Sequence, residues 1–113
     1  MEPQTEIIDL LQKIAESLFP EDFDRATDTQ AILLEKIRLR NTELHLAVQD
    51  FIFALESMQF VASDYQLRLK AADIWKQQNE MFMGLLQTRA GDLLAEARKN
   101  GLQIETEIKN LIS

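Results

Sequence analysis

No proline and no glycine interrupts this chain between Pro20 and Gly84. The remaining breakers are Pro3, Gly91 and Gly101. Because proline and glycine are the strongest helix breakers, and good helix formers fill the interval, the sequence favours long helices. No alternation of apolar and polar residues, which would indicate strands, persists anywhere. We therefore expect an all-α fold, either a helical bundle or an antiparallel coiled coil, built on two long helices with a short N-terminal helix.

Turn and capping residues divide the chain into four expected helices within one domain, residues 1–113. Pro20 ends the first helix, since proline disfavours a helical conformation in the residue before it. The best candidate for the next break is Ser63-Asp64, because Ser63 and Gln66 have the spacing of a capping box. Asn100-Gly101 is a typical C-terminal stop. The expected helices span approximately residues 5–18, 28–62, 65–99 and 102–112.

The expected second helix carries an apolar seam at heptad spacing. When Leu34 is assigned to position a, Asn41 is the one clearly polar residue at positions a and d. Such a seam is typical of a helix that packs against neighbouring helices, and a buried polar residue at position a can fix the register. The a and d positions are Leu34, Ile37, Asn41, Leu44, Val48, Phe51, Leu55, Met58, Ala62, Tyr65, Leu69 and Ala72.

A second apolar line, called the f line below, occupies heptad position f. On a straight helix this position lies about 140° from position a, where polar residues are usual. The adjoining positions b and c are polar, as the seam predicts. The f line keeps its phase through Ser63-Asp64, so one helix over residues 28–99 is the alternative to a break there. The f line consists of Ile32, Leu39, Leu46, Phe53, Phe60, Leu67, Ile74 and Met81.

A helix that is apolar on two sides needs cover on both of them. If the rest of this short chain packs on the seam, Phe53 and Phe60 face water and form a patch typical of an interface. Burial of such side chains contributes roughly 1.5–3 kcal/mol each. Trp75 belongs to a residue type that is enriched at interfaces. The alternative is a central helix that its own chain covers on both sides. The predicted interaction surface consists of Leu39, Leu46, Phe53, Phe60, Leu67, Ile74 and Trp75.

Charge is spread unevenly along this acidic chain, whose formal net charge is −7. Residues 1–28 hold eight acidic and two basic residues, whereas residues 65–113 hold six acidic and seven basic ones. An acidic chain without a basic stripe repels the phosphate backbone, so we expect no nucleic-acid binding. The acidic start either favours solubility and stabilises helix N-termini, or it docks a basic partner.

Cysteine is absent, which excludes disulfides and thiolate zinc sites. The start Met1-Glu2-Pro3-Gln4 lacks the basic and apolar regions of a signal peptide. The longest apolar run, residues 51–55, is far too short to cross a bilayer. Asp92 and Glu96 have the spacing to share a cation, but such an acidic pair is more often solvated. We expect a cytoplasmic protein with no transmembrane segment, no metal and no cofactor.

The segment around the single histidine resembles the motif of HEPN-domain proteins, which are small helical bundles and often ribonuclease toxins. That motif has an arginine, often followed by a polar residue, and then a histidine after four to six residues; Arg40, Asn41 and His45 fit it. The resemblance covers residues 40–45 and implies Arg40 and His45 as catalytic residues across a dimer cleft. Ala47 stands where many members have a tyrosine. The alternative is that His45 flanks the seam and Arg40 is a solvated charge.

Three classes of function follow from these patterns. The first is a non-enzymatic protein-binding module, comparable to small acidic export chaperones and adaptors that cover an amphipathic segment of a client. The second is a phasin-like coat of granule or lipid surfaces, since residues 87–101, QTRAGDLLAEARKNG, have that general character. The third is a HEPN-like ribonuclease. We expect the first class, with no catalytic residues and with a homodimer, a partner protein helix, or both.

Overall fold

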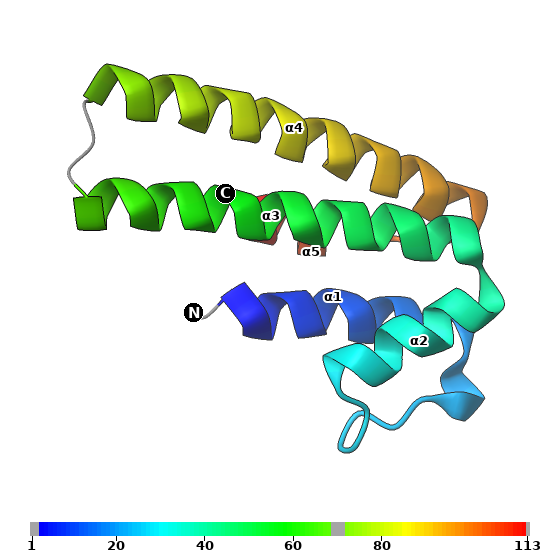
Figure 1. Cartoon of the computed structure of the whole chain (residues 1–113). Coiled ribbons are helices and arrows are strands. Elements are labelled where there is room, and N and C mark those ends of the chain that lie inside the picture. The colour runs from blue at the N-terminus through cyan, green and yellow to red at the C-terminus, as the bar shows by residue number, and fades with distance from the viewer. Residues whose placement is uncertain (1–2, 69–71, 113) are drawn as a thin grey trace.

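The computed structural model describes the backbone of residues 3–68 and 72–112, and the side-chain environment of residues 7–58, 77 and 80–112. The described backbone is helical and contains no strand, so the predicted all-α class is confirmed (Figure 1). Its elements are α1 (Pro3–Leu18), the short 3-10 helix η1 (Pro20–Asp22), α2 (Gln30–Arg40), α3 (Thr42–Arg68), α4 (Ala72–Lys99) and α5 (Glu105–Ile112).

A helical hairpin of α3 and α4 gives the molecule its length. The two helices run side by side in opposite directions along an elongated body of 51 × 28 × 22 Å (Figure 1). The remaining helices pack around the hairpin: α2 contacts α3, and α1 contacts both α2 and α5. The N-terminal and C-terminal helices therefore lie against each other, although they are at opposite ends of the chain.

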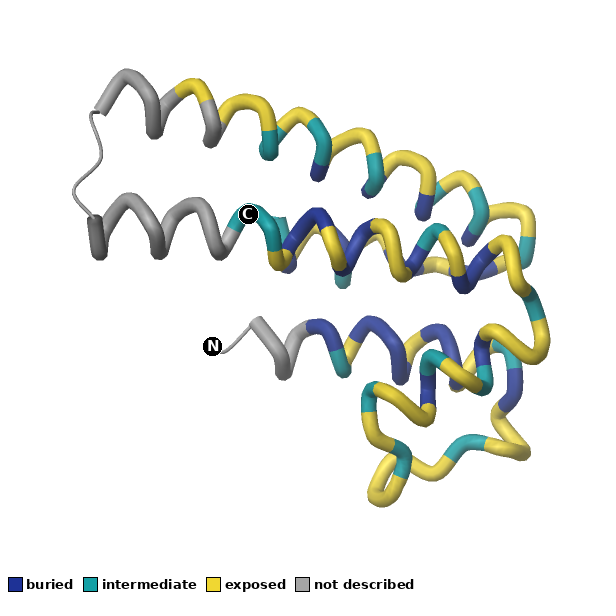
Figure 2. The backbone as a smooth tube through the Cα atoms, viewed as in Figure 1, coloured by how far each residue is buried: buried dark blue, intermediate teal, exposed yellow. Residues whose placement is uncertain are grey.

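The core draws apolar side chains from all five α-helices. Figure 2 shows the buried residues of α4 on the side toward α3. The seam is buried at Ile37, Leu44, Val48, Phe51 and Leu55, which confirms the seam prediction for these residues. Each such burial stabilises the fold by roughly 1.5–3 kcal/mol. The largest fully buried side chains are Phe51, Leu10, Leu11, Ile14, Leu33, Ile37, Leu44, Leu86, Leu93, Ile104, Ile108 and Val48.

The single helix predicted over residues 28–62 is wrong, because the chain breaks at Asn41. Asn41 has extended backbone angles, φ −155° and ψ 99°, and its N–H donates to the Ile37 carbonyl at 2.8 Å to end α2. Its side-chain Oδ1 accepts from the Leu44 N–H at 3.1 Å and thereby caps α3. Asparagine is favoured at this position because its short side chain reaches a free amide of the first turn. Glu43 in that turn adds a favourable charge.

The break suggested at Ser63-Asp64 is also wrong, since α3 continues through both residues to Arg68. Residues 69–71, between α3 and α4, lie outside the described part. The helix predicted over residues 65–99 accordingly begins later, at Ala72. The first helix begins at Pro3, where proline is tolerated because an amide in the first turn has no intrahelical partner.

The stop predicted at Asn100-Gly101 is confirmed. Gly101 has φ +71°, a left-handed conformation that favours glycine. The Leu102 N–H donates to the Ala97 carbonyl at 2.9 Å and the Gly101 N–H to the Arg98 carbonyl at 3.1 Å, which together form a Schellman motif. The final helix begins at Glu105 and not near residue 102, because the chain first crosses in a non-helical link that buries Leu102 and Ile104.

Candidate interaction surface

The exposed large apolar residues fall on one sequence pattern. Among the residues whose side chains are described, five large hydrophobic residues are strongly exposed, and all five belong to the f line. Phe53 is the most exposed of them, at 71%. The chain therefore leaves these f-line positions uncovered, and the alternative of a helix wrapped on both sides does not hold at them. The five residues are Ile32, Leu39, Leu46, Phe53 and Met81.

The break at Asn41 divides these positions between helices. Leu39 lies on α2, whereas Leu46 and Phe53 lie on α3, and the chain changes direction sharply between the two helices (Figure 1). The predicted surface is therefore not one straight line along a single rod. We call the part of this surface on α3 whose side chains are described the α3 outer face. It consists of the exposed residues Glu43, Leu46, Gln49, Asp50, Phe53 and Glu56.

The α3 outer face has an apolar centre and an acidic border. Leu46 and Phe53 are seven residues apart, which is about 10.5 Å along a helix and nearly two turns. Residues three and four apart are neighbours on a helix surface, so Glu43, Asp50 and Glu56 flank the two apolar side chains. All three carboxylates are exposed. This arrangement, an apolar centre with a polar rim, is typical of protein interfaces.

The remaining residues of the predicted surface lie beyond the described side chains. Phe60 and Leu67 follow Phe53 on α3, and Ile74 and Trp75 lie near the start of α4. Their backbone is helical, but their side-chain environment is outside the described residues. Their assignment to the surface stays a prediction.

Arg40 and His45, the candidate ribonuclease residues, lie on different helices. The Arg40 guanidinium, at the end of α2, donates to Asp22 Oδ2 at 2.8 Å and lies 4.4 Å from the centre of the Phe19 ring. His45 lies in the first turns of α3 and is 9% exposed, so its ring is largely buried. Arg40 is thus an ion-pair and stacking partner within the chain, and not simply a solvated charge.

A shallow depression lies beside Arg40 at the end of α1. Its volume is about 380 Å³. Arg40 and Asp22, which already pair with each other, belong to its polar lining, and Phe19 belongs to its apolar lining. The other lining residues are Leu18, Pro20 and Glu21.

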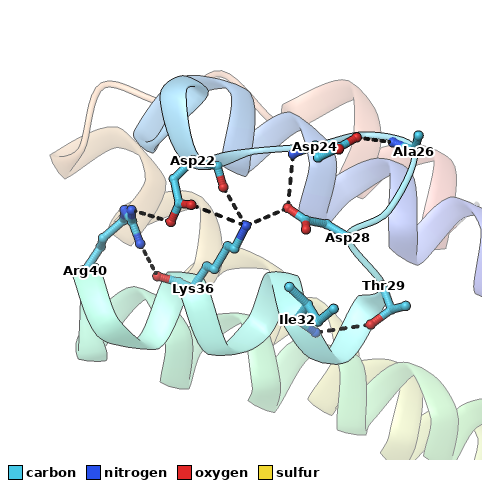
Figure 3. A network of polar contacts seen from close by, with 8 residues as sticks. All are labelled: Asp22, Asp24, Ala26, Asp28, Thr29, Ile32, Lys36 and Arg40. Atoms are coloured by element: carbon cyan, nitrogen blue, oxygen red, sulfur yellow. Dashed lines mark hydrogen bonds and ion pairs between the residues drawn. The ribbon is translucent and has the colours of Figure 1, made fainter.

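A network of charges ties the connection between α1 and α2 onto α2 (Figure 3). Lys36 Nζ donates to the Asp22 carbonyl at 2.6 Å and to Asp28 Oδ2 at 2.9 Å. The hydrogen bond from Lys36 is the main cause that lowers the pKa of Asp28, and the Asp24 N–H, which donates to the same carboxylate, adds to it. The pKa of Lys36 is raised in turn, chiefly by Asp28. These charges therefore hold the connection in its folded position against α2.

Asn41 does more than cap a helix, and the sequence pattern did not reveal this. Its Nδ2 donates to Asn100 Oδ1 at 2.9 Å, and Asn100 Nδ2 donates to the Glu96 carbonyl at 2.8 Å. The junction of α2 and α3 is thereby fastened to the C-terminal end of α4. Asparagine followed by Thr42 and Glu43 is a sequence signal for the start of a helix, and it could have predicted the start of α3. The regular heptad pattern around Asn41 favoured a continuous helix instead.

Comparisons with known protein families, with curated proteins and with solved structures find no match to this chain. Among the residues that the structure describes, no helix is both long and apolar enough to cross a membrane. The same part of the chain holds no group of three or more histidine, aspartate and glutamate side chains placed to bind a metal ion. The structure thus defines an all-α protein with a long helical hairpin.

Proposed function

We propose that this protein acts by binding another protein chain through the α3 outer face, in the manner of a small helical chaperone or adaptor. The observation that carries the proposal is the exposure of Phe53, at 71%, and of Leu46, at 53%, on a helix whose opposite side is core. The occupant is a helix of a partner protein or a second copy of this chain.

The fold covers one side of α3 and leaves the other side in water. Phe51 and Phe53 are two residues apart on α3, yet Phe51 is fully buried whereas Phe53 is mostly in water. An exposed phenylalanine beside an exposed leucine contributes little to folding, but burying each against a partner contributes roughly 1.5–3 kcal/mol. Large aromatic residues at the centre of an interface often carry much of the binding energy.

The test is a Phe53→Glu variant, which places a charge at the centre of the α3 outer face. The wild-type chain is expected to self-associate in sedimentation velocity or to retain a partner protein on purification. In the variant we expect this association to weaken roughly tenfold or more, since loss of one buried phenylalanine is worth more than 1.4 kcal/mol. Circular dichroism should show unchanged helicity, because no core side chain is removed.

Gln87→Glu is the matched control, because it adds the same charge at an exposed position of α4. It is expected to leave both association and helicity as in the wild type. A wild-type chain that is monomeric and holds no partner contradicts the proposal. So does a Phe53→Glu variant that unfolds, since the ring would then belong to the protein's own core.

A further inference from the structure

We infer that the α3 outer face binds an amphipathic helix of a partner protein whose apolar stripe is flanked by lysine and arginine, and not a second copy of this chain. The inference rests on the proposed function and names the class of partner. It comes from the charges that surround Leu46 and Phe53.

The border of the α3 outer face carries one sign of charge. Glu43, Asp50 and Glu56 are all exposed, and no lysine or arginine occurs between Asn41 and Leu67. An apolar stripe with acidic flanks is complementary to an apolar stripe with basic flanks. The spacing of Leu46 and Phe53 fits a partner helix with apolar side chains at positions i and i+7, or i, i+3, i+4 and i+7.

Seven of the nine basic residues whose side chains are described form ion pairs away from the α3 outer face, whereas Lys13 and Lys109 form none with the described residues. On α2, Lys36 pairs with Asp28, Arg38 with Glu35 and Arg40 with Asp22. On α4, the three basic residues whose side chains are described also pair with acids, as Arg89 with Asp92, Arg98 with Glu105 and Lys99 with Glu96.

The acids of the α3 outer face differ from Asp22 and Asp28, which form ion pairs with basic residues of α2. Among the described residues, none forms an ion pair with Glu43, Asp50 or Glu56. Within the described part of the chain, these three charges are therefore left to contact a partner.

The same face of a second copy is a poor occupant of this face. If two α3 outer faces met, each would present its three carboxylates to the other and neither would supply a base, in parallel or antiparallel orientation. Like charges opposed across an interface disfavour it and reject wrong partners. A basic amphipathic helix, in contrast, removes the apolar surface from water and supplies a cation for each acid.

Two synthetic helical peptides test the inference against the full chain by fluorescence anisotropy. Both carry the same leucine stripe at i, i+3, i+4 and i+7; one has lysine at the flanking positions and the other has glutamate. We expect the basic peptide to bind at least about tenfold more tightly, since several rim charge pairs together are worth about one factor of ten. A third peptide, with the basic composition in scrambled order, should bind about as weakly as the acidic one.

Matched charge variants separate this face from the overall acidity of the protein. The variant Glu43→Gln/Asp50→Asn/Glu56→Gln is expected to bind the basic peptide about tenfold more weakly. The variant Asp9→Asn/Glu21→Gln/Glu80→Gln changes net charge equally at exposed sites on α1, η1 and α4. Its affinity should fall less than about twofold, because screening weakens distant charges.

The outcomes distinguish the inference from the proposed function. Equal losses in the two triple variants, or tight binding of the scrambled peptide, would show attraction to net charge and overturn the inference. If the basic peptide fails to bind while the wild-type chain forms a dimer that Phe53→Glu disrupts, the partner class is wrong and the binding function stands. If neither peptide binding nor self-association responds to Phe53→Glu, both proposals fail.

Discussion

The α3 outer face and the connection between α1 and α2 are both exposed and both acidic, yet they use their charges in different ways. In the connection, Asp22 and Asp28 bind Lys36 and Arg40 of α2, so the acids hold the chain to its own helix. On the α3 outer face, the acids border apolar side chains, and no described residue pairs with them. Acidity on a surface is therefore informative only when the partners of each acid are known.

The two regions also differ in the burial of their aromatic residues. Phe19, at the start of the connection, is buried and lies beneath the Arg40 guanidinium. Phe53 projects from α3 into water. The first region is covered by its own chain, whereas the described part of the chain leaves Phe53 in the second region uncovered.

The largest expected effect compares two neighbouring phenylalanines on α3. Phe51→Ala should lower the free energy of unfolding by about 3–5 kcal/mol, because it opens a cavity in the core. Phe53→Ala should change it by less than about 0.5 kcal/mol, as is usual for exposed positions. Urea unfolding followed by circular dichroism measures both. Similar losses in the two variants would mean that the α3 outer face is part of the folding core, and the contrast drawn above would disappear.

A second, smaller effect is expected at Asn41, which joins α2 to α3. Asn41→Ala removes the cap of α3 and the bond to Asn100, and we expect a loss of about 1–2 kcal/mol in the free energy of unfolding. Asn41→Asp keeps the capping oxygen but cannot donate to Asn100, so it should recover part of the loss. A variant Asn41→Ala as stable as the wild type would show that packing alone holds the junction.

The smallest expected effect concerns the pH dependence of the connection. Because Lys36 holds the pKa of Asp28 below that of a free aspartate, the folded state gains stability while this carboxylate is ionised. That gain is present above the pKa of the unfolded chain and is lost as the pH falls through the folded pKa. The wild type should therefore exceed Asp28→Asn in thermal stability at neutral pH, and the difference should shrink as the pH falls below the pKa of a free aspartate.

Lys36→Met provides the control for this titration. Without the ammonium group, Asp28→Asn should alter the acid dependence much less, because the main cause of the lowered pKa of Asp28 has been removed. Lys36 itself stays protonated throughout this range, since its pKa is raised above its ordinary high value. A pH-dependent difference that persists in the Lys36→Met background would assign the effect to the backbone bond from Asp24.

Much of the fold could be predicted from local patterns. The lack of breakers after Pro20, the heptad seam and the Asn100-Gly101 stop predicted the helical class, the buried residues Leu44 to Leu55 at seam positions, and the end of α4. The break at Asn41 was missed because asparagine is compatible both with a seam position and with a helix cap. The contact that distinguishes these roles comes from Asn100, which is remote in sequence.

The sequence by itself determined the helical class and the two apolar periodicities, because backbone propensity and side-chain spacing are properties of neighbouring residues. Only the tertiary structure decided which periodicity faces the core and which faces water, because that depends on where α1, α4 and α5 pack. It also decided which acids are neutralised, since Lys36 and Arg40 reach Asp22 only when the connection folds back along α2. Long-range packing thus converts one of two similar apolar lines into core and leaves the described residues of the other exposed.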